Sequence, residues 1–218
     1  VSVIASISVD HVDSLGTSVS SIAREKAGII KGGGSTVTYP KQEVDALAIL
    51  MERCAEMDNT LYIPTSYQVH SSDIHGSDVT IDGLSFHIPL AGEHQVYNAT
   101  MVVGACRVLQ QTLNISEENI CKGIEHTSFP SRVEVLSEHP LVILDGAHNL
   151  SGANALANML DSLGGRTIHA VIGIMQDKDV DGFIHVIAER CTSIITTSLE
   201  DMPRFISPVE LAEKARRD

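Results

Sequence analysis

The first part of the chain alternates short apolar runs with amphipathic stretches. Three apolar runs predict strands, at 1–9, 35–39 and 61–66. Two stretches with helical periodicity lie between them, at 18–30 and 43–57. In the second helix we expect one buried face, formed by Val44, Leu47, Ala48, Met51 and Cys54. This alternation is typical of a parallel sheet with helices on its faces.

The pattern changes after residue 66. Residues 67–90 alternate apolar and polar positions, with Asp82-Gly83 between two runs, which predicts a β-hairpin. Two helices are expected next, at 94–112 and 116–126, and Ser116 is a residue type that caps helix starts.

A second alternating unit follows residue 129. Its apolar runs predict strands at 133–136, 141–146, 167–174 and 193–197. Helices are predicted at 151–163, at 180–190 and near the carboxyl end. Continuous Val, Ile and Leu runs indicate a parallel sheet covered on both faces. We therefore expect an α/β fold with two domains, 1–129 and 130–218, divided near Phe129-Pro130.

Composition narrows the class of protein. The formal net charge is -13 over 218 residues, which argues against nucleic acid or an anionic membrane as a partner. The four cysteines lack metal-ligand spacing, as expected of reduced thiols in a cytoplasmic protein. We expect a cytoplasmic monomer. Residue 1 is not Met and lies within an apolar run, and the last residues form a helical pattern with no strand after it, so we also expect a chain cut at both ends.

Lys26 is unusual within the first predicted helix. At about 100° per residue it falls in the middle of an apolar stripe, formed by Val19, Ile22, Ala23, Ala27 and Ile30. A buried ammonium must pair, extend to solvent or lose its proton, and a neutral amine can react with CO2 to give a carbamate able to hold Mg2+. The alternative is a lysine that extends from the edge of the stripe, or pairs with Glu25 or with an acidic residue elsewhere.

His11 follows the first predicted strand. In open parallel sheets, ligands collect beyond the carboxyl ends of the strands, which makes His11 a candidate ligand-binding residue. Its alternative is a structural, hydrogen-bonded histidine, and Asp10 and Asp13 are equally compatible with capping the turn that follows.

The segment SISVDHVDSLGTSVSSIAREKAGIIK resembles a signature of the folylpolyglutamate synthase and dihydrofolate synthase branch of the Mur ligase family. The resemblance implies that His11 is a magnesium ligand and that Lys26 is carbamylated and catalytic. It also implies the fold: the end of a central ATPase domain with a parallel sheet and a small β-hairpin region, then a Rossmann-like α/β domain.

A second signature combines FPSRVEVL with VILDGAHNLSGANAL. The residues alone indicate a glycine-containing turn before a helix start, which suits an anion, although without the resemblance they favour a well-capped helix. The resemblance implies that Arg132 and Asp145 contact ATP and that His148 lies near the reacting phosphate. Ser131 stands where the family usually has Gly, and Leu150 where it usually has Pro.

A third segment, LAGEHQVYNATMVVGACRVL, has the pattern of an amphipathic helix, and the resemblance implies that Asn98 contacts the adenine nucleotide. The sequence contains no GxxxxGK[ST] phosphate loop. In the family this loop precedes the histidine signature, so we expect the chain alone to be inactive.

The resemblance implies an ATP-dependent ligase that joins L-glutamate to folate or dihydropteroate through an acyl phosphate, with ATP and Mg2+. Two alternatives remain: a nucleotide-binding or interaction module without catalysis, and another Mur-type amino-acid ligase.

Overall fold

The computed structural model describes residues 1–8 and 18–216, and the chain divides into two compact units, Val1–Ser128 and Phe129–Asp218. The division falls one residue before the predicted boundary. Each unit is described separately below. None of the described helices is long and apolar enough to cross a membrane.

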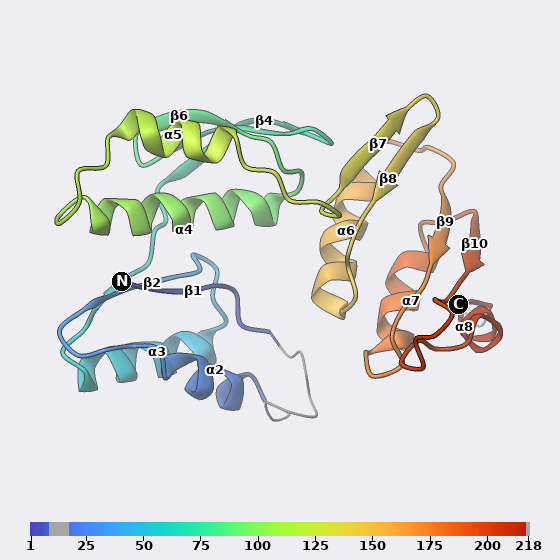
Figure 1. The fold of residues 1–218 in the computed structure, drawn as a ribbon, viewed down its shortest axis with the longest axis horizontal. Coiled ribbons are helices and arrows are strands. Elements are labelled where there is room, and N and C mark those ends of the chain that lie inside the picture. Colours follow the sequence, from blue (N-terminus) through green and yellow to red (C-terminus); the bar gives the residue numbers. More distant parts are fainter. Residues whose placement is uncertain (9–17, 217–218) are drawn as a thin grey trace. The chain divides into compact units, whose positions relative to one another are not determined.

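The amino-terminal unit contains a small parallel sheet. Its strands are β1 (Ser2–Ile4), β2 (Ser35–Thr38) and β3 (Thr60–Tyr62), in that order across the sheet. Helices α2 (Val19–Ala27) and α3 (Val44–Glu56) lie on one side of these strands, and α4 (Glu93–Leu109) lies on the other (Figure 1). The apolar run at the amino end therefore forms a shorter strand than predicted.

The buried face of α3 differs from the prediction. Ala46, Leu50 and Cys54 face the core, whereas Val44 is 80% exposed and Met51 is 55% exposed. The predicted spacing of four residues is present, but the buried row is displaced around the helix. Apolar residues surround most of α3, so periodicity alone does not select the arc that meets α2 and the sheet.

Residues 67–88 form a three-stranded antiparallel sheet rather than one hairpin. Its strands are β4 (Tyr67–Asp73), β5 (Gly76–Ile81) and β6 (Leu84–Ile88). Alternate side chains of β5 and β6 pack on α4 and α5 (Glu117–Glu125), which Ser116 caps as expected. Asp82-Gly83 makes the second turn, with positive φ at both residues, as a tight hairpin requires.

The carboxyl-terminal unit contains two separate two-stranded sheets. Strands β7 (Glu134–Glu138) and β8 (Leu141–Leu144) are antiparallel. Strands β9 (His169–Ile172) and β10 (Ser193–Thr196) are parallel. Three helices complete the unit: α6 (Leu150–Ser162), α7 (Val180–Ala188) and α8 (Pro208–Ala215). The elements match the predicted order, but among the described residues the strands do not join into the single parallel sheet expected.

Candidate functional site

The end of β8 meets the start of β7 in the carboxyl-terminal unit. Glu134 pairs with Leu144 at the end of the antiparallel ladder, which places the turns just beyond these residues side by side. The amide of Gly146 donates to the carbonyl oxygen of Ser131 at 2.7 Å. A Cβ atom at position 146 would lie 3.1 Å from that same oxygen. Glycine therefore allows the close approach of the two turns.

The Asp145 carboxylate connects both turns. Its Oδ2 accepts from the amide of Val133 at 2.9 Å, and its Oδ1 accepts from the amide of Ala147 at 2.8 Å. Each carboxylate oxygen has two lone pairs, so each retains one acceptor position for a ligand hydroxyl or amide. Asp145 thus organises the backbone and can still accept a hydrogen bond from a ligand.

Arg132 lies between two residues with left-handed backbone. Ser131 has φ of 60° and Val133 has φ of 50°. A non-glycine residue in this region costs about 1–3 kcal/mol, and a β-branched residue such as Val133 is an outlier there. The Ser131 conformation is one that glycine adopts without strain, and this is the position where the family pattern usually has glycine.

The side chains of Arg132 and His148 lie near these turns. The Arg132 guanidinium stacks over the Phe129 ring, with its carbon 5.5 Å from the ring centroid. His148 is exposed, and its Nδ1 lies 2.8 Å from the carbonyl oxygen of Gly146. Because a carbonyl only accepts, Nδ1 carries a hydrogen, and Nε2 faces away from this bond. The structure thus brings Arg132, Asp145 and His148 to one end of the β7–β8 ladder.

Helix α6 begins directly after this loop. The Asn149 side chain accepts from the amide of Gly152 at 2.8 Å and caps the helix. Leu150 occupies the first helical position, where proline is favoured because its missing N–H has no intrahelical partner. Asn149 has a non-helical backbone as a cap requires, so leucine at position 150 leaves the helix start intact.

Each unit contains a hollow lined by its described residues. In the carboxyl-terminal unit, Asp145 and Ala147 border a cleft of about 570 Å³ between the edges of β8 and β9. In the amino-terminal unit, a cavity of about 340 Å³ is bounded by β6, α4 and α5, with walls that are mainly apolar. Its volume lies within the range of small-molecule pockets.

Asn98 lines the second hollow, on α4. Its Nδ2 donates to Oε1 of the buried Gln95 at 3.0 Å, which orients the Asn98 amide. Its Oδ1 and a second N–H can pair with one edge of a planar heterocycle. The predicted nucleotide contact therefore lies in a cavity with apolar walls and an amide on its lining.

Lys26 does not lie on the buried face of α2, contrary to the prediction. Ile22, Ala23 and Ala27 are buried there, whereas Lys26 is exposed. It belongs to the last turn of a helix that ends at Ala27, and its four-carbon stem can carry the ammonium to solvent. Burial therefore provides no argument for a carbamate. His11 lies outside the described residues.

No metal site is formed by the described residues. Within 1–8 and 18–216, no three His, Cys, Asp or Glu side chains are placed to hold an ion. The predicted magnesium site thus has no donor set in this part of the chain.

The structure also shows groupings that sequence analysis missed. Lys41 and Glu93 both bond the Tyr97 hydroxyl, and the Tyr39 and Tyr97 rings are in edge contact. Burial raises the pKa of both phenols, that of Tyr39 to about 12, and both are protonated at neutral pH. Lys41 and Tyr39 lie far from Glu93 and Tyr97 in the sequence, so no local pattern predicted this group.

The carboxyl-terminal unit matches a known family. Residues 131–218 match the family model described as "Mur ligase, glutamate ligase domain". The chain is 31% identical over 209 residues to folylpolyglutamate synthase of Lacticaseibacillus casei, covering 90% of this chain and 47% of the relative.

Solved structures share the fold. One is Mycobacterium tuberculosis folylpolyglutamate synthase complexed with ADP and AMPPCP (TM-score 0.86, 29% identity, 99% of this chain, 51% of that chain). Another is a bifunctional folylpolyglutamate synthase/dihydrofolate synthase with Mn, AMPPNP and L-glutamate bound (TM-score 0.73, 32% identity, 97% and 51%). The family resemblance and the α/β fold class are confirmed. The chain spans about half the length of these relatives.

Proposed function

We propose that this chain is part of an ATP-dependent ligase that joins L-glutamate to folate or dihydropteroate. The chain is a relative of the folylpolyglutamate and dihydrofolate synthases, and its carboxyl-terminal unit matches the glutamate ligase domain of Mur ligases. The observation that carries the proposal is the joining of Arg132, Asp145 and His148 at one end of the β7–β8 ladder. Arg132 lies 13 residues before Asp145 and 16 before His148 in the sequence, and the three residues supply a cation, an acceptor and a histidine at one place.

Amide synthesis from a carboxylate needs an activated acyl group. In the proposed reaction, the substrate carboxylate attacks the γ-phosphorus of ATP, which releases ADP and forms an acyl phosphate. The glutamate amine then attacks the acyl carbon, loses a proton, and expels inorganic phosphate. Groups that position phosphates and neutralise their charge lower the barrier to the first step.

Each residue in the carboxyl-terminal unit suits one part of that task. Arg132 supplies a permanent planar cation for a phosphate or a pair of donors for a ribose oxygen. Asp145 keeps free acceptor positions for ribose hydroxyls while it holds the backbone. His148, with Nδ1 bonded to Gly146, presents Nε2, which donates to a phosphate oxygen when the imidazole carries a hydrogen on both nitrogens.

The cavity beside Asn98 suits a nucleobase. Its apolar walls match the faces of an aromatic ring, and the Asn98 amide, oriented by Gln95, can donate to and accept from one edge of adenine. We assign this cavity to the adenine of ATP.

Magnesium and the Lys26 carbamate rest on the family resemblance. When bound, Mg2+ neutralises charge on the ATP phosphates, and His11 is the residue proposed as its ligand. A carbamate would increase the mass of Lys26 by one CO2, which mass spectrometry under CO2 detects directly. An unmodified Lys26 under those conditions would remove this part of the proposal.

Nucleotide binding by the chain tests the core of the proposal. We expect ADP and AMPPNP to bind in titration calorimetry, and Arg132→Ala to weaken binding by roughly tenfold, the effect of about 1.4 kcal/mol. Asn98→Ala should weaken it by a similar factor. Arg216→Ala and Asn114→Ala, which change exposed residues elsewhere, are matched controls.

Three outcomes separate the candidate functions. Binding that depends on Arg132 and Asn98 supports the ligase assignment. Binding that neither variant changes would instead favour a nucleotide-binding module unrelated to these residues. No binding of either nucleotide by the wild-type chain would refute the proposed nucleotide sites.

A further inference from the structure

Glu134 is a carboxylate that the proposed reaction leaves unused. It is the first residue of β7, and its backbone is held in the ladder opposite Leu144. Its side chain reaches back along the chain, where Oε2 accepts from the amide of Ser131 at 2.8 Å. Glu134 is only partly exposed, and this contact joins the strand to the turn that precedes it.

The two strained residues around Arg132 each donate to a carboxylate. The Ser131 amide donates to Glu134, and the Val133 amide donates to Asp145. Both residues have left-handed φ, which disfavours any side chain larger than hydrogen. Hydrogen bonds to an ionised carboxylate are among the strong ones, so these two contacts can offset the strain.

This arrangement fixes the backbone on both sides of Arg132. If Ser131 left the left-handed region, its peptide group would rotate, and the direction of the following residue would change. The Arg132 guanidinium lies at the end of a long side chain, so a small rotation at the backbone moves it substantially. Its stacking on Phe129 depends on the same direction.

We propose that Glu134 is a positioning residue, whose carboxylate holds Ser131 in the left-handed conformation and thereby directs Arg132 toward the nucleotide. Glu134 acts through the backbone and makes no contact with the ligand. The part that concerns affinity rests on the proposed function, whereas the part that concerns the turn depends only on the described contacts.

The contact with a backbone amide separates this role from an ion pair. If Glu134 acted by its charge on Arg132, Glu134→Gln would weaken nucleotide binding as much as Glu134→Ala does. If it acts as a hydrogen-bond acceptor, Glu134→Gln keeps an oxygen for the Ser131 amide and retains most of the affinity. Ser131→Gly should also rescue Glu134→Ala in part, because glycine adopts positive φ without strain.

The affinity for ADP gives the first test. We expect Glu134→Ala to raise the Kd for ADP roughly fivefold to tenfold, as for one lost hydrogen bond. Glu134→Gln should stay within about twofold of the wild type. The double variant Glu134→Ala with Ser131→Gly should lie between them. Glu200→Ala, in an exposed turn of the same unit, is the control.

Amide hydrogen exchange gives a second test that needs no nucleotide. In Glu134→Ala, exchange should become faster at Ser131 and at Val133, while the amides of α7 keep their protection. Unchanged exchange at Ser131 would show that the Glu134 carboxylate does not hold the turn, and would overturn the proposal. Equal Kd values for Glu134→Ala and Glu200→Ala would do the same.

The two tests keep the two proposals distinguishable. If the wild-type chain binds no ADP but Glu134→Ala accelerates exchange at the turn, the nucleotide assignment fails and the role of Glu134 in the turn stands. If Glu134→Gln loses as much affinity as Glu134→Ala, charge rather than hydrogen bonding is responsible, and the positioning role is wrong. Thermal unfolding of each variant identifies any general loss of structure.

Discussion

Replacing Gln42 with leucine should destabilise the amino-terminal unit. The side chain is 9% exposed and lies between the chain that leaves β1 and the end of β2. Its Oε1 accepts from the Ile7 amide at 2.8 Å, and its Nε2 donates to the Ala5 carbonyl at 3.1 Å and the Thr38 hydroxyl at 3.2 Å. The side-chain amide of Gln42 therefore links the segment after β1 to the end of β2.

The size of the stability loss follows from the hydrogen bonds that leucine cannot make. Leucine has nearly the same volume, so no large cavity is created. The Ile7 amide loses its acceptor in a residue that is 1% exposed, which costs about 1–3 kcal/mol. The other two bonds contribute less, because Ala5 is exposed and its carbonyl can turn to water, and the buried Thr38 hydroxyl keeps its bond to the Ile4 carbonyl. We expect a total loss of roughly 2–4 kcal/mol in the free energy of unfolding.

Tyrosine fluorescence provides a selective assay. The chain has no Trp, and its four tyrosines, at 39, 62, 67 and 97, all lie in the amino-terminal unit. Urea unfolding followed by tyrosine emission thus reports on this unit without requiring both units to unfold together. Gln111→Leu, at an exposed position, is the control and should change stability by less than about 0.5 kcal/mol. An equally small effect of Gln42→Leu would refute the reasoning.

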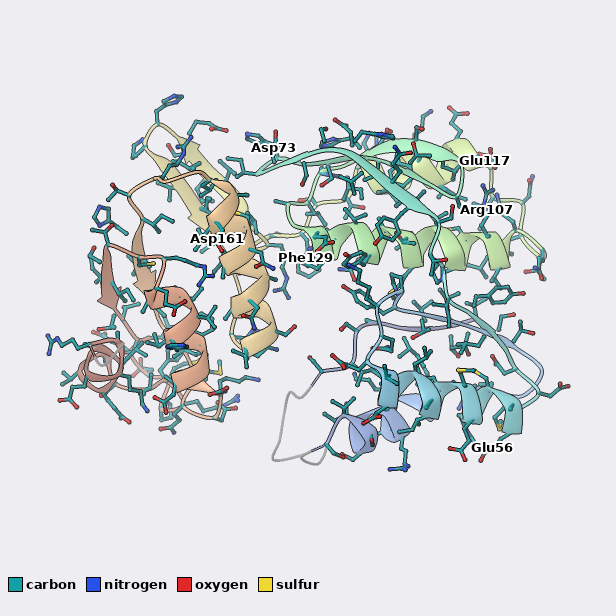
Figure 2. The ribbon with its side chains drawn as sticks, turned by 180° about the vertical axis from the view of Figure 1, so that it is seen from behind. Glu56, Asp73, Arg107, Glu117, Phe129 and Asp161 are labelled. Carbon is teal, nitrogen blue, oxygen red and sulfur yellow. The ribbon has the colours of Figure 1, made fainter. Side chains whose placement is uncertain are left out.

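Two further predictions concern the same unit. Arg107 bonds Asp82 at 2.7 Å and Glu117 at 2.6 Å and so joins the β5–β6 turn to α5; Figure 2 labels Arg107 and Glu117 beside each other. Arg107→Ala should lower the urea midpoint, and the effect should be smaller at 1 M NaCl because salt screens these ion pairs. A loss of stability that does not depend on salt would contradict this. The Tyr97 hydroxyl lowers the pKa of Glu93, so the unfolded state binds the proton more tightly, and this stabilisation should be lost as pH falls below about 4.5. Glu93→Gln should flatten the dependence of stability on pH in that range, and an unchanged slope would count against it.

Sequence reasoning located the elements better than their faces. Helices such as α4 and α5 lie within a few residues of their predicted bounds, because caps and periodicity are local signals. Lys26 is exposed, which fits the alternative of a lysine that extends to solvent and not the buried position, because a helical wheel weighs every position of the stripe equally, whereas the helix ends one residue later. The hairpin at Ile74-His75 was missed because its turn lacks the Asn-Gly or Asp-Gly signal.

For the candidate site, too, the sequence predicted some features and not others. Family motifs indicated Arg132, Asp145 and His148, and the structure brings them to one ladder end. The motifs do not show the backbone conformation of the turns that carry these residues. Asp145 stabilises a neighbouring turn through the Val133 amide, and Glu134 does so through Ser131, and neither contact follows from spacing. A motif residue can thus be required for the shape of a site as much as for contact with a ligand.

The β9–β10 sheet shows why an apolar run does not establish how a strand is covered. Ile172 and Ile194 pack into the core with α7 and α8, whereas Val171 is 69% exposed and Ile195 is 62% exposed. Val171 and Ile195 are cross-strand partners, so they form one apolar row on the face opposite that core. Their side chains alternate with buried ones, which is the geometry of any strand. An apolar run therefore shows that either face of a strand can be buried. Which face is buried depends on the helices and strands that pack against it.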